Sequence, residues 1–324
     1  MSTQRDTIFS QVSDVEYTTM DRLSHTWNQF VRAPMSILIH DWRSLLGLSI
    51  LVFYFLVGTV GVMSYRTPTS GQGGERYIEP FQSWELPLGT DHMQHDVLAL
   101  FIHATPFMLQ MMLAGAIFTV VLGTAWGVTA GFVGGRTDQV MMTVSDIVMT
   151  IPGLPLILVL ATFFSPRHAV LVGIIVVINS WAGLSRLIRS EVLSMRQLGY
   201  IRASKTMGLS TSRILTKDVI PGIMPYVAIK FVQASRSVIY ASVALYFLGV
   251  LPFTSANWGV MLNLAYEQGA LILPHALHAI MVPIVAIMLM SLGLTLLAQG
   301  ADQMFNPRLR ARHAGKTTSM DELD

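Results

Sequence analysis

The uncharged run SLLGLSILVFYFLVGTVGVMS, residues 44–64, decides the fold class of this chain. It is rich in Leu, Val and Phe, and its only polar side chains are hydroxyl groups. A helix needs about 20 apolar residues to cross the roughly 30 Å of hydrocarbon in a bilayer. The run therefore predicts a membrane-spanning helix.

The whole chain has the composition of an integral membrane protein. Of its 324 residues, 52% are hydrophobic and only 12% are charged, against about 25% charged in an ordinary soluble domain. The net charge of +2 does not indicate a nucleic-acid partner, because the basic residues flank apolar runs instead of forming one soluble face. The sequence has no cysteine, which excludes disulfides and thiolate metal sites. A polar start followed by a long, late apolar run argues against a signal peptide.

Further apolar runs predict five more helices, so we expect an all-α polytopic membrane protein with six transmembrane helices. They lie within residues 104–133 and at 139–164, 169–185, 219–250 and 276–300. The fifth helix has a second possible boundary, at 237–256. In the second helix Gly123, Gly127 and Gly131 recur at every fourth position, a spacing that lets another helix pack closely. Pro152 and Pro155 lie inside the third.

Lysine and arginine placement orients these helices by the positive-inside rule. Sixteen of the 21 basic residues fall before the first helix, between the second and third, in the segment 186–217 or in the tail, and only Arg66, Arg76 and Arg167 fall on the opposite side. Both termini are therefore expected in the cytoplasm. The predicted organisation is a cytoplasmic segment 1–43, a membrane domain 44–300 and a cytoplasmic tail 301–324. The domain includes an external loop 65–103 and a cytoplasmic loop 186–221.

The basic stretch YIRASKTMGLSTSRILTKDVIPGIMP, residues 200–225, interrupts the apolar pattern. We expect a short helix over 197–207, which Gly208 ends by adopting a positive φ. Ser210 or Thr211 would cap a second helix that runs toward Pro221. Such a compact projection suits docking on a soluble partner. The alternative is an ordinary basic loop that only orients the helices.

Motifs along the chain resemble the permease subunits of binding-protein-dependent ABC importers, in the branch for dipeptides, oligopeptides and nickel. Arg202-Ala203-Ser204 with Gly208 and Pro221 resembles the "EAA" loop of these subunits. The other matches, in chain order, are Pro87 to Asp91 with Asp96 to Leu98, Gly131 to Asp138, Asp146 with Ile151-Pro152, Phe247 to Gly249 with Trp258-Gly259, and Asn306 to Arg310. Together they cover roughly residues 20 to 310.

This resemblance implies a type I ABC importer permease fold in a prokaryotic inner membrane, with six helices around half of a shared pathway. The implied partners are a second permease in a heterodimer, two ABC ATPase subunits, an extracytoplasmic substrate-binding protein and the lipid bilayer. The residues expected to contact the ATPase are Tyr200, Arg202, Ala203, Ser204, Gly208, Arg213 and Pro221. The sequence departs from the family pattern at three positions: Arg202 replaces a usual glutamate, Gly222 a common asparagine, and Ser242 a glutamate.

Three charged residues within the apolar runs are candidates for the pathway. A charge at mid-depth costs about 2.5 to 3.5 kcal/mol, so Lys230 and Arg236 need compensation. One alternative is that at least one of them lines the path and attracts an acidic or carboxylate-bearing solute. The other is that they pair with a carboxylate of the partner permease or lie at the cytoplasmic interface. At about 100° per residue they lie about 120° apart around a helix. Asp146 either serves the pathway or pairs with Arg136 or Arg186.

Other chemistries find little support in the sequence. His92 and His95 with Asp91 and Asp96 suggest a metal site only weakly. Gly315-Lys316 lacks the first glycine of a P-loop, so ATP hydrolysis is assigned to partner subunits, and we expect no catalytic residues and no cofactor. Two other functions remain open: a secondary transporter, which would need a coupling-ion site, and a membrane scaffold or sensor.

Overall fold

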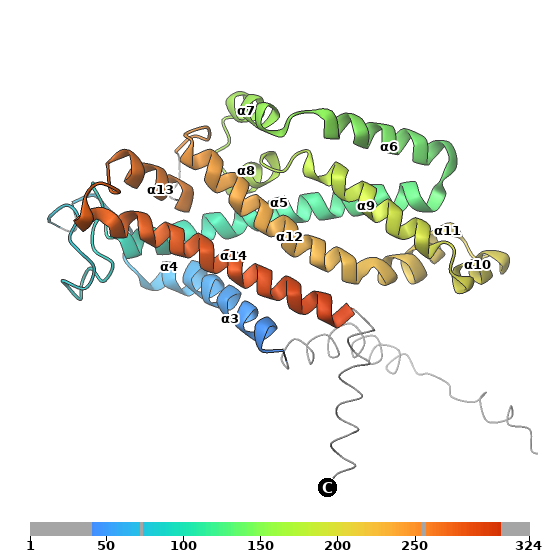
Figure 1. Ribbon diagram of the computed structural model, residues 1–324, viewed down its shortest axis with the longest axis horizontal. Helices are drawn as coiled ribbons and strands as arrows, with labels where there is room; N and C mark the ends of the chain where they lie inside the picture. Colours follow the sequence, from blue (N-terminus) through green and yellow to red (C-terminus); the bar gives the residue numbers. More distant parts are fainter. Residues whose placement is uncertain (1–40, 72–73, 254–256, 306–324) are drawn as a thin grey trace, which may run out of the picture.

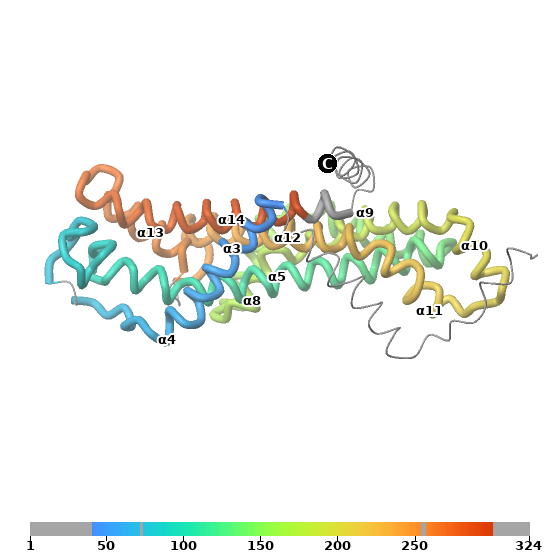
Figure 2. The backbone as a smooth tube through the Cα atoms, turned by 90° about the horizontal axis from the view of Figure 1, so that it is seen from below, coloured from blue at the N-terminus to red at the C-terminus, as the bar shows by residue number. Residues whose placement is uncertain are grey.

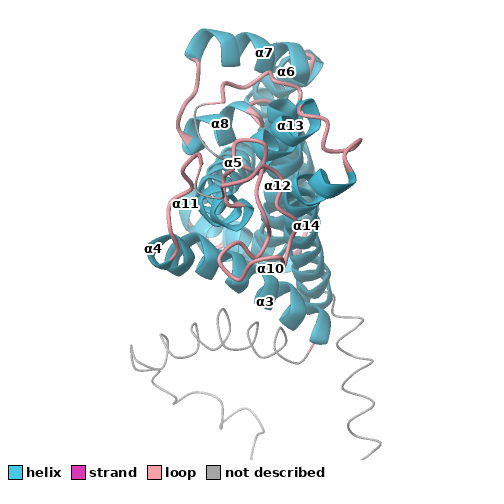
Figure 3. Ribbon diagram, turned by 90° about the vertical axis from the view of Figure 1, so that its left-hand side faces the viewer, coloured by secondary structure: helices cyan, strands magenta, loops and turns pink. Residues whose placement is uncertain are grey.

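The computed structural model describes residues 41–71, 74–253 and 257–305 of the chain (Figure 1). The described part is helical and elongated, and its only strand-like feature is an isolated antiparallel bridge between Thr90 and Asp96. Figure 3 shows the helices end-on, with loops at the near end. The predicted N-terminal segment, most of the predicted tail and the motif from Asn306 to Arg310 lie outside the described residues.

The elements follow one another along the chain with short connections, apart from the segment between α4 and α5. They are α3 (Trp42–Leu56), η2 (Val57–Gly61), α4 (Val62–Ser64), α5 (Val97–Val133), α6 (Gly135–Thr150), α7 (Gly153–Phe164), α8 (Ala169–Ile175), α9 (Ser180–Met195), α10 (Gly199–Thr206), α11 (Thr211–Ile214), η3 (Leu215–Val219), α12 (Ile220–Phe247), α13 (Trp258–Glu267), η4 (Pro274–Ala276) and α14 (Leu277–Phe305).

Helix α5 is the central element and contacts α8, α9 and α12. Its 37 residues give a length of about 55 Å. The Asp96 side chain caps its first turn by accepting the backbone N–H of Leu98 at 2.9 Å. The helix ends where Gly134 takes a φ of 73°, a conformation that glycine adopts without steric cost.

The glycine spacing in α5 produces the predicted close packing. A Cβ atom on Gly127 would lie 2.4 Å from the carbonyl oxygen of Ser185 in α9, and one on Gly123 would lie 2.9 Å from that of Trp181. No Cβ atom fits at 2.4 Å, so α5 and α9 approach backbone to backbone. The prediction that these glycines admit a neighbouring helix is confirmed.

Two predicted helices are each broken in the structure. The span predicted at 139–164 consists of α6 and α7, which meet at 83°. The break follows from Pro152, whose ψ of 123° is extended and whose ring cannot continue a helix. The span predicted at 169–185 consists of α8 and of α9, which reaches Met195, and these meet at 63°.

Judged by length and composition, the described residues contain fewer candidate spans than the six that we expected. Three helices, at 42–64, 97–133 and 274–300, are long and apolar enough to cross a membrane, and five spans result if each bent pair counts as one. Helix α12 is 28 residues long but carries Lys230, Gln233 and Arg236 within seven positions. It follows the first of the two predicted boundaries for the fifth helix. Helix α5 begins earlier than expected, so the loop before it ends at Asp96.

Two buried apolar clusters stabilise the bundle. The larger contains Tyr54 and Trp258, whose ring centroids lie 5.3 Å apart, and it extends over α5, α8, α12 and α14. The second is built around the end of α5, α9 and the start of α12, and it includes Ile201 and Ile214. Figure 2 shows α13 at one end of the molecule and α10 and α11, which carry Ile201 and Ile214 of the second cluster, at the other.

Candidate functional site

The segment of residues 199–219, which we call the knob, projects from one end of the bundle (Figures 1 and 2). It consists of α10, α11 and η3. At the opposite end lies the segment of residues 65–96, which we call the long loop. The knob contains most of the residues that the sequence assigned to an ATPase contact.

The turn at the centre of the knob has the predicted chemistry. Gly208 adopts a φ of 75°, and its N–H donates to the carbonyl of Lys205 at 3.0 Å. The next N–H, of Leu209, donates back to the carbonyl of Ser204 at 3.2 Å. Ser210 then caps α11, because its Oγ accepts the backbone N–H of Arg213 at 3.4 Å. The expected positions of the turn and of the cap are confirmed.

Apolar side chains attach the knob to the bundle. Ile201, Ile214 and Val219 are each exposed by 1% or less and join the second cluster. The Lys205 ammonium lies 4.6 Å from the centroid of the Phe132 ring at the end of α5, within the range of a cation–π interaction. The sequence analysis did not identify these anchors. Ile214 and Val219 each stand beside a second apolar residue, Leu215 and Ile220, within the basic stretch, and these pairs are the signal that could have indicated a buried side.

The outer surface of the knob presents most of the predicted contact residues. Arg202, Ala203, Gly208 and Arg213 are exposed, and Tyr200 is 52% exposed. Two predicted residues do not belong to this surface. The half-buried Ser204 donates to Asp218 Oδ2 at 3.4 Å, and Pro221 lies in the first turn of α12.

One large apolar side chain, absent from the predicted set, adds to this exposed surface. Met207 is 77% exposed and directly precedes the Gly208 turn. Methionine is flexible and polarizable, properties that suit an adaptable contact surface. The knob thus combines a rigid apolar inner side with an outer side that is aromatic, apolar and basic.

Arginines of α9 link the base of the knob to α5 and α6. Arg189 binds Asp138 through two nitrogens, and both N–O distances are 2.5 Å. Arg196 donates from Nη1 to the carbonyl of Gly131 at 2.9 Å. These contacts hold the connection between α5 and α6 against α9, close to the place where the knob begins.

Asp146 is paired within the chain. Its carboxylate accepts a hydrogen bond from Arg186 Nη2 and forms an ion pair with it, and both side chains are about half exposed. Of the two alternatives for Asp146, the arrangement supports the ion pair with Arg186. The assignment of Asp146 to a pathway gains no support from this geometry.

Lys230 and Arg236 differ in their surroundings. Lys230 Nζ donates to Gln233 Oε1 of its own helix at 3.0 Å and lies 5.1 Å from the ring centroid of Tyr226. Arg236 instead reaches across to α14, where its Nη1 donates to Thr295 Oγ1 at 2.9 Å. Among the side chains described up to Gly300, neither cation has a carboxylate within ion-pair distance.

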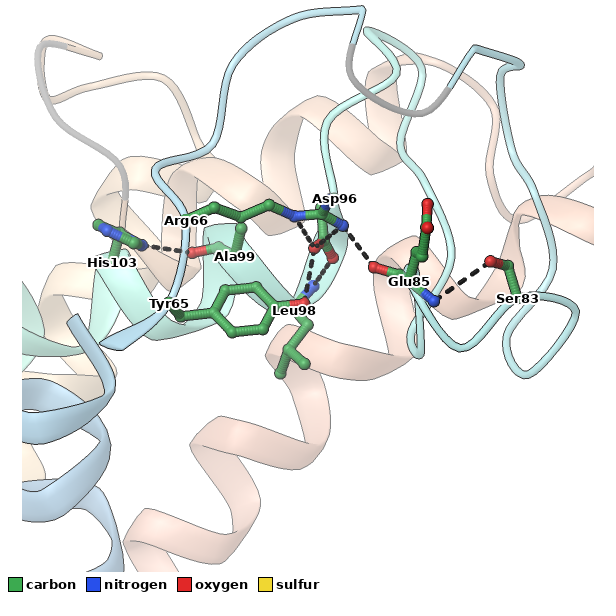
Figure 4. Close-up of polar contacts among 8 residues, drawn as sticks. All are labelled: Tyr65, Arg66, Ser83, Glu85, Asp96, Leu98, Ala99 and His103. Carbon is green, nitrogen blue, oxygen red and sulfur yellow. Dashed lines mark hydrogen bonds and ion pairs between the residues drawn. The ribbon is translucent and has the colours of Figure 1, made fainter. Parts of the chain in front are cut away.

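The long loop is fixed to α5 by a buried carboxylate (Figure 4). Asp96 Oδ2 accepts hydrogen bonds from Arg66 Nη2 at 2.9 Å, from Arg66 Nε at 3.2 Å and from the Tyr65 hydroxyl at 2.9 Å. Arg66 also donates to the backbone carbonyl of Glu85, which ties the middle of the loop to the same point. The hydrogen bond to the Asp96 carboxylate raises the pKa of the Arg66 guanidinium.

The two histidines of the long loop serve its internal structure. His95 Nδ1 lies 2.9 Å from Asp91 Oδ2, and Nδ1 of His92 lies 3.9 Å from the same oxygen. Burial lowers the pKa of His92, which favours the neutral form. Within the described ranges, no cluster of three or more His, Cys, Asp or Glu side chains is arranged to hold a metal ion.

Comparisons with known proteins agree with this architecture. Residues 123–311 match the family described as "Binding-protein-dependent transport system inner membrane component". The chain is 26% identical to the dipeptide transport system permease protein DppC of Bacillus subtilis over 312 residues, which cover 93% of this chain and 95% of the relative. It is 27% identical to the oligopeptide permease OppC of the same organism over 223 residues, 68% of this chain and 72% of the relative.

A nickel permease shows a similar degree of likeness. The nickel transport system permease protein NikC of Escherichia coli is 29% identical over 183 residues, which cover 56% of this chain and 65% of that protein. The family match covers more than half of the chain and contains the knob, α12 and α14. This chain therefore belongs to the family of inner membrane components of binding-protein-dependent transport systems.

Proposed function

We propose that this chain forms one half of the translocation pathway of an ABC importer and couples to separate ATPase subunits through the knob. The second half would come from a different permease subunit in a heterodimer, and a substrate-binding protein would dock at the long-loop end. Membership in a family of binding-protein-dependent permeases supports this assembly. The relatives that carry dipeptides and oligopeptides in their names make peptides the proposed solute.

The proposed topology has six spans, in which α12 is added to the five candidate spans and is the fifth in chain order. In favour of this count, α12 contacts both α5 and α14, two of the helices that are apolar enough to cross a membrane. Its polar residues would be covered by the second permease or line the pathway. With both termini in the cytoplasm, the knob lies on the side where ATP is found, and the basic residues around it agree with the positive-inside rule.

The observation that carries the coupling role is the two-sided structure of the knob. Its inner side contains Ile201, Ile214 and Val219, packed against α5, α9 and α12, so that a displacement of the knob is transmitted to these helices. Its outer side exposes Tyr200 and Met207. A membrane subunit without a nucleotide site receives the work of ATP through such a contact, and closure of the ATPase pair would bias a two-state equilibrium of the pathway.

Site-specific crosslinking tests this role, and the chain is suited to it because it has no cysteine. A Met207→Cys variant places the only thiol of the chain on the outer side of the knob. In the assembled importer we expect it to crosslink to an ATPase subunit through a short bifunctional reagent. Met63→Cys is the matched control, because Met63 is 89% exposed and belongs to α4, which directly precedes the long loop.

Crosslinking and solute uptake together separate the competing functions. Absence of crosslinks from Met207→Cys and also from Tyr200→Cys would contradict the coupling role. Solute uptake that depends on an ion gradient and not on ATP would indicate a secondary transporter. A complex that binds its partners and transports no solute would indicate a scaffold or sensor.

A further inference from the structure

A row of polar side chains, which we call the polar seam, lies along the contact between α12 and α14. Gln233, Tyr240 and Gln299 are exposed, and Arg236 and Thr295 are half-buried. The two helices contact each other along this seam. Its members are Gln233, Arg236 and Tyr240 from α12 and Ser291, Thr295 and Gln299 from α14. Helix α14 is apolar enough to count among the candidate membrane-spanning helices even with these residues included. The polar groups therefore stand out on it and call for an explanation.

The hydrogen bonds of the seam fix the direction in which Arg236 points. The Thr295 hydroxyl donates to the backbone carbonyl of Ser291 at 2.8 Å. Its oxygen therefore has a lone pair free to accept the Arg236 Nη1–H, at 2.9 Å. Nearby, the hydroxyl groups of Tyr240 and Ser291 form a hydrogen bond to each other. The guanidinium is thus held against α14 by a single neutral acceptor.

A cavity of about 170 Å³ opens beside this guanidinium. Gln233, Thr295 and Gln299 line it together with the apolar Val232, Leu294 and Ala298. A water molecule occupies about 30 Å³ in the liquid, so the cavity has room for a carboxylate group. Amide and hydroxyl groups on the walls supply further hydrogen bonds.

The charge of Arg236 has no carboxylate partner within 4.0 Å among the side chains described up to Gly300. Arg236 is the seventeenth of the 28 residues of α12, about 24 Å from the start of that helix. A charge at such depth is costly unless an anion or water accompanies it. Guanidinium has five N–H donors in a planar fork, and this geometry matches a carboxylate bidentately.

We propose that Arg236 and the cavity beside it bind the carboxylate of the solute during its passage. This inference rests on the proposed transport function and adds a solute requirement to it: a carboxylate, such as the free C-terminus of a peptide. The site would select solutes with a carboxylate within the membrane subunit, independently of the choice that the binding protein makes. Arg236 binds the anion, and Thr295 positions the guanidinium.

Lys230 provides a matched control because it is the other cation of α12. Its ammonium interacts with Gln233 and Tyr226 of the same helix, and it does not line the cavity. Loss of either cation removes one positive charge from α12. Only the loss of Arg236 removes a group that faces the cavity, so the pair separates a specific site from a general effect of charge.

Transport by the complete importer in proteoliposomes tests the site, with trialanine and trialaninamide as probes. Arg236→Gln keeps hydrogen-bonding capacity without the charge, and we expect it to reduce ATP-dependent uptake of trialanine by about 10-fold or more, the usual scale for a hydrogen bond to a charged group. Uptake of trialaninamide, which has no carboxylate, should be nearly unchanged. Lys230→Gln should leave the ratio of the two rates as in the wild type. Arg236→Lys should be intermediate, because an ammonium cannot bind bidentately.

Thiol labelling tests the same site without the binding protein. A Gln299→Cys variant places the only thiol of the chain on the cavity wall. We expect it to react faster with an anionic methanethiosulfonate reagent than with a cationic one of similar size. Adding Arg236→Gln should abolish this preference, whereas adding Lys230→Gln should retain it. Trialanine at millimolar concentration should slow the reaction more than trialaninamide does. This measurement stands whether or not the binding protein accepts trialaninamide.

Three outcomes would overturn the inference, and they differ from a failure of the transport function. An Arg236→Gln importer with the wild-type ratio of uptake rates and the wild-type labelling preference would show that Arg236 binds no solute carboxylate. Equal loss of uptake for both probes, together with loss of the second permease on purification, would show that Arg236 pairs with a carboxylate of that subunit. If the wild-type importer takes up neither probe with ATP, the proposed peptide transport itself is contradicted.

Discussion

The two ends of the molecule are held in place by different kinds of interaction. The long loop is fixed by directional hydrogen bonds that involve side chains. The carboxylates of Asp96 and Asp91 accept such bonds, and the Thr90 hydroxyl donates one to a backbone carbonyl. His278 of α14 adds a contact of 2.8 Å from its Nε2 to the carbonyl of Thr90. The knob is attached mainly by apolar side chains such as Ile201 and Ile214.

This difference has a physical consequence. A hydrogen bond weakens steeply when its angle or length changes, whereas apolar contact is non-directional. The long loop is therefore confined to one geometry, and the knob can shift by small amounts without losing its stabilisation. Such a contrast suits an end that supports a docking surface and an end that receives force.

The largest effect should follow from removing the main anchor of the knob. Ile201→Ala deletes methyl and methylene groups that are fully buried, and such deletions cost about 2 to 5 kcal/mol. We expect local unfolding of the knob, measured as faster limited proteolysis between residues 196 and 220, together with loss of ATP-dependent uptake. Met207→Ala, at an exposed position of the same turn, should leave proteolysis unchanged. Equal protection of the two variants would contradict the apolar attachment.

The next effect concerns the buried carboxylate of the long loop. Asp96→Ala removes a helix cap and the hydrogen bonds from Arg66 and Tyr65. We expect a loss of about 2 to 3 kcal/mol in unfolding free energy; the loss is limited because the Arg66 side chain is 38% exposed and water can solvate it. Thermal unfolding in detergent measures this change. Glu85→Ala is the control, since Arg66 uses only the backbone carbonyl of Glu85, and an equal loss there would refute the assignment.

A smaller effect is expected at the turn of the knob. Gly208→Ala forces an L-residue to adopt a φ of 75°, at a cost of about 1 kcal/mol, although no atom lies within 4 Å of the added methyl group. Gly199→Ala has equally open surroundings and no positive φ, so it should be neutral. The difference between the two variants in the proteolysis rate of the knob measures the cost of the positive φ at position 208. Equal proteolysis rates would contradict that cost.

The smallest effect is a pH dependence of the long loop. Burial lowers the pKa of His92 below its ordinary value of 6.5, so the unfolded state binds a proton before the folded state does. Stability from this residue is fully present above about pH 6.5 and is lost as the pH falls further. Asp91 opposes the shift, and His95 and Arg76 reinforce it. The fall in melting temperature between about pH 7.5 and pH 5.5 should be smaller in His92→Gln; an unchanged fall would exclude His92 as its source.

Local chemistry made part of the site predictable from the sequence. Gly208 and Ser210 were found because a turn and a helix cap depend on residues within a few positions of each other. The first helix was predicted because an uninterrupted apolar run of about 20 residues has the length of a membrane-spanning helix. The glycine spacing of α5 identified its packed face for the same reason: the pattern lies within one helix.

Contacts between distant segments were not predictable. Thr295 is 59 residues from Arg236, and no periodicity in α12 indicates that partner. The breaks in two helices were not predicted because hydropathy measures how long an apolar run is and does not show where the helix axis bends. The bend between α8 and α9 accompanies a close approach of α8 to α5, where a Cβ atom on Gly173 would lie 2.2 Å from the carbonyl oxygen of Met111.

The length of α5 links the two contrasting ends mechanically. This helix is capped by Asp96, the hydrogen-bonded last residue of the long loop, and its final turn contains Phe132, whose ring contacts Lys205 of the knob. At about 55 Å it exceeds the roughly 30 Å hydrocarbon layer, and a helix resists compression along its axis because every turn is hydrogen-bonded. Pro106 is the one position within it that lacks an N–H donor. The separation of the two ends is therefore set by the length of α5, and Pro106 is the position at which its ladder of backbone hydrogen bonds is interrupted.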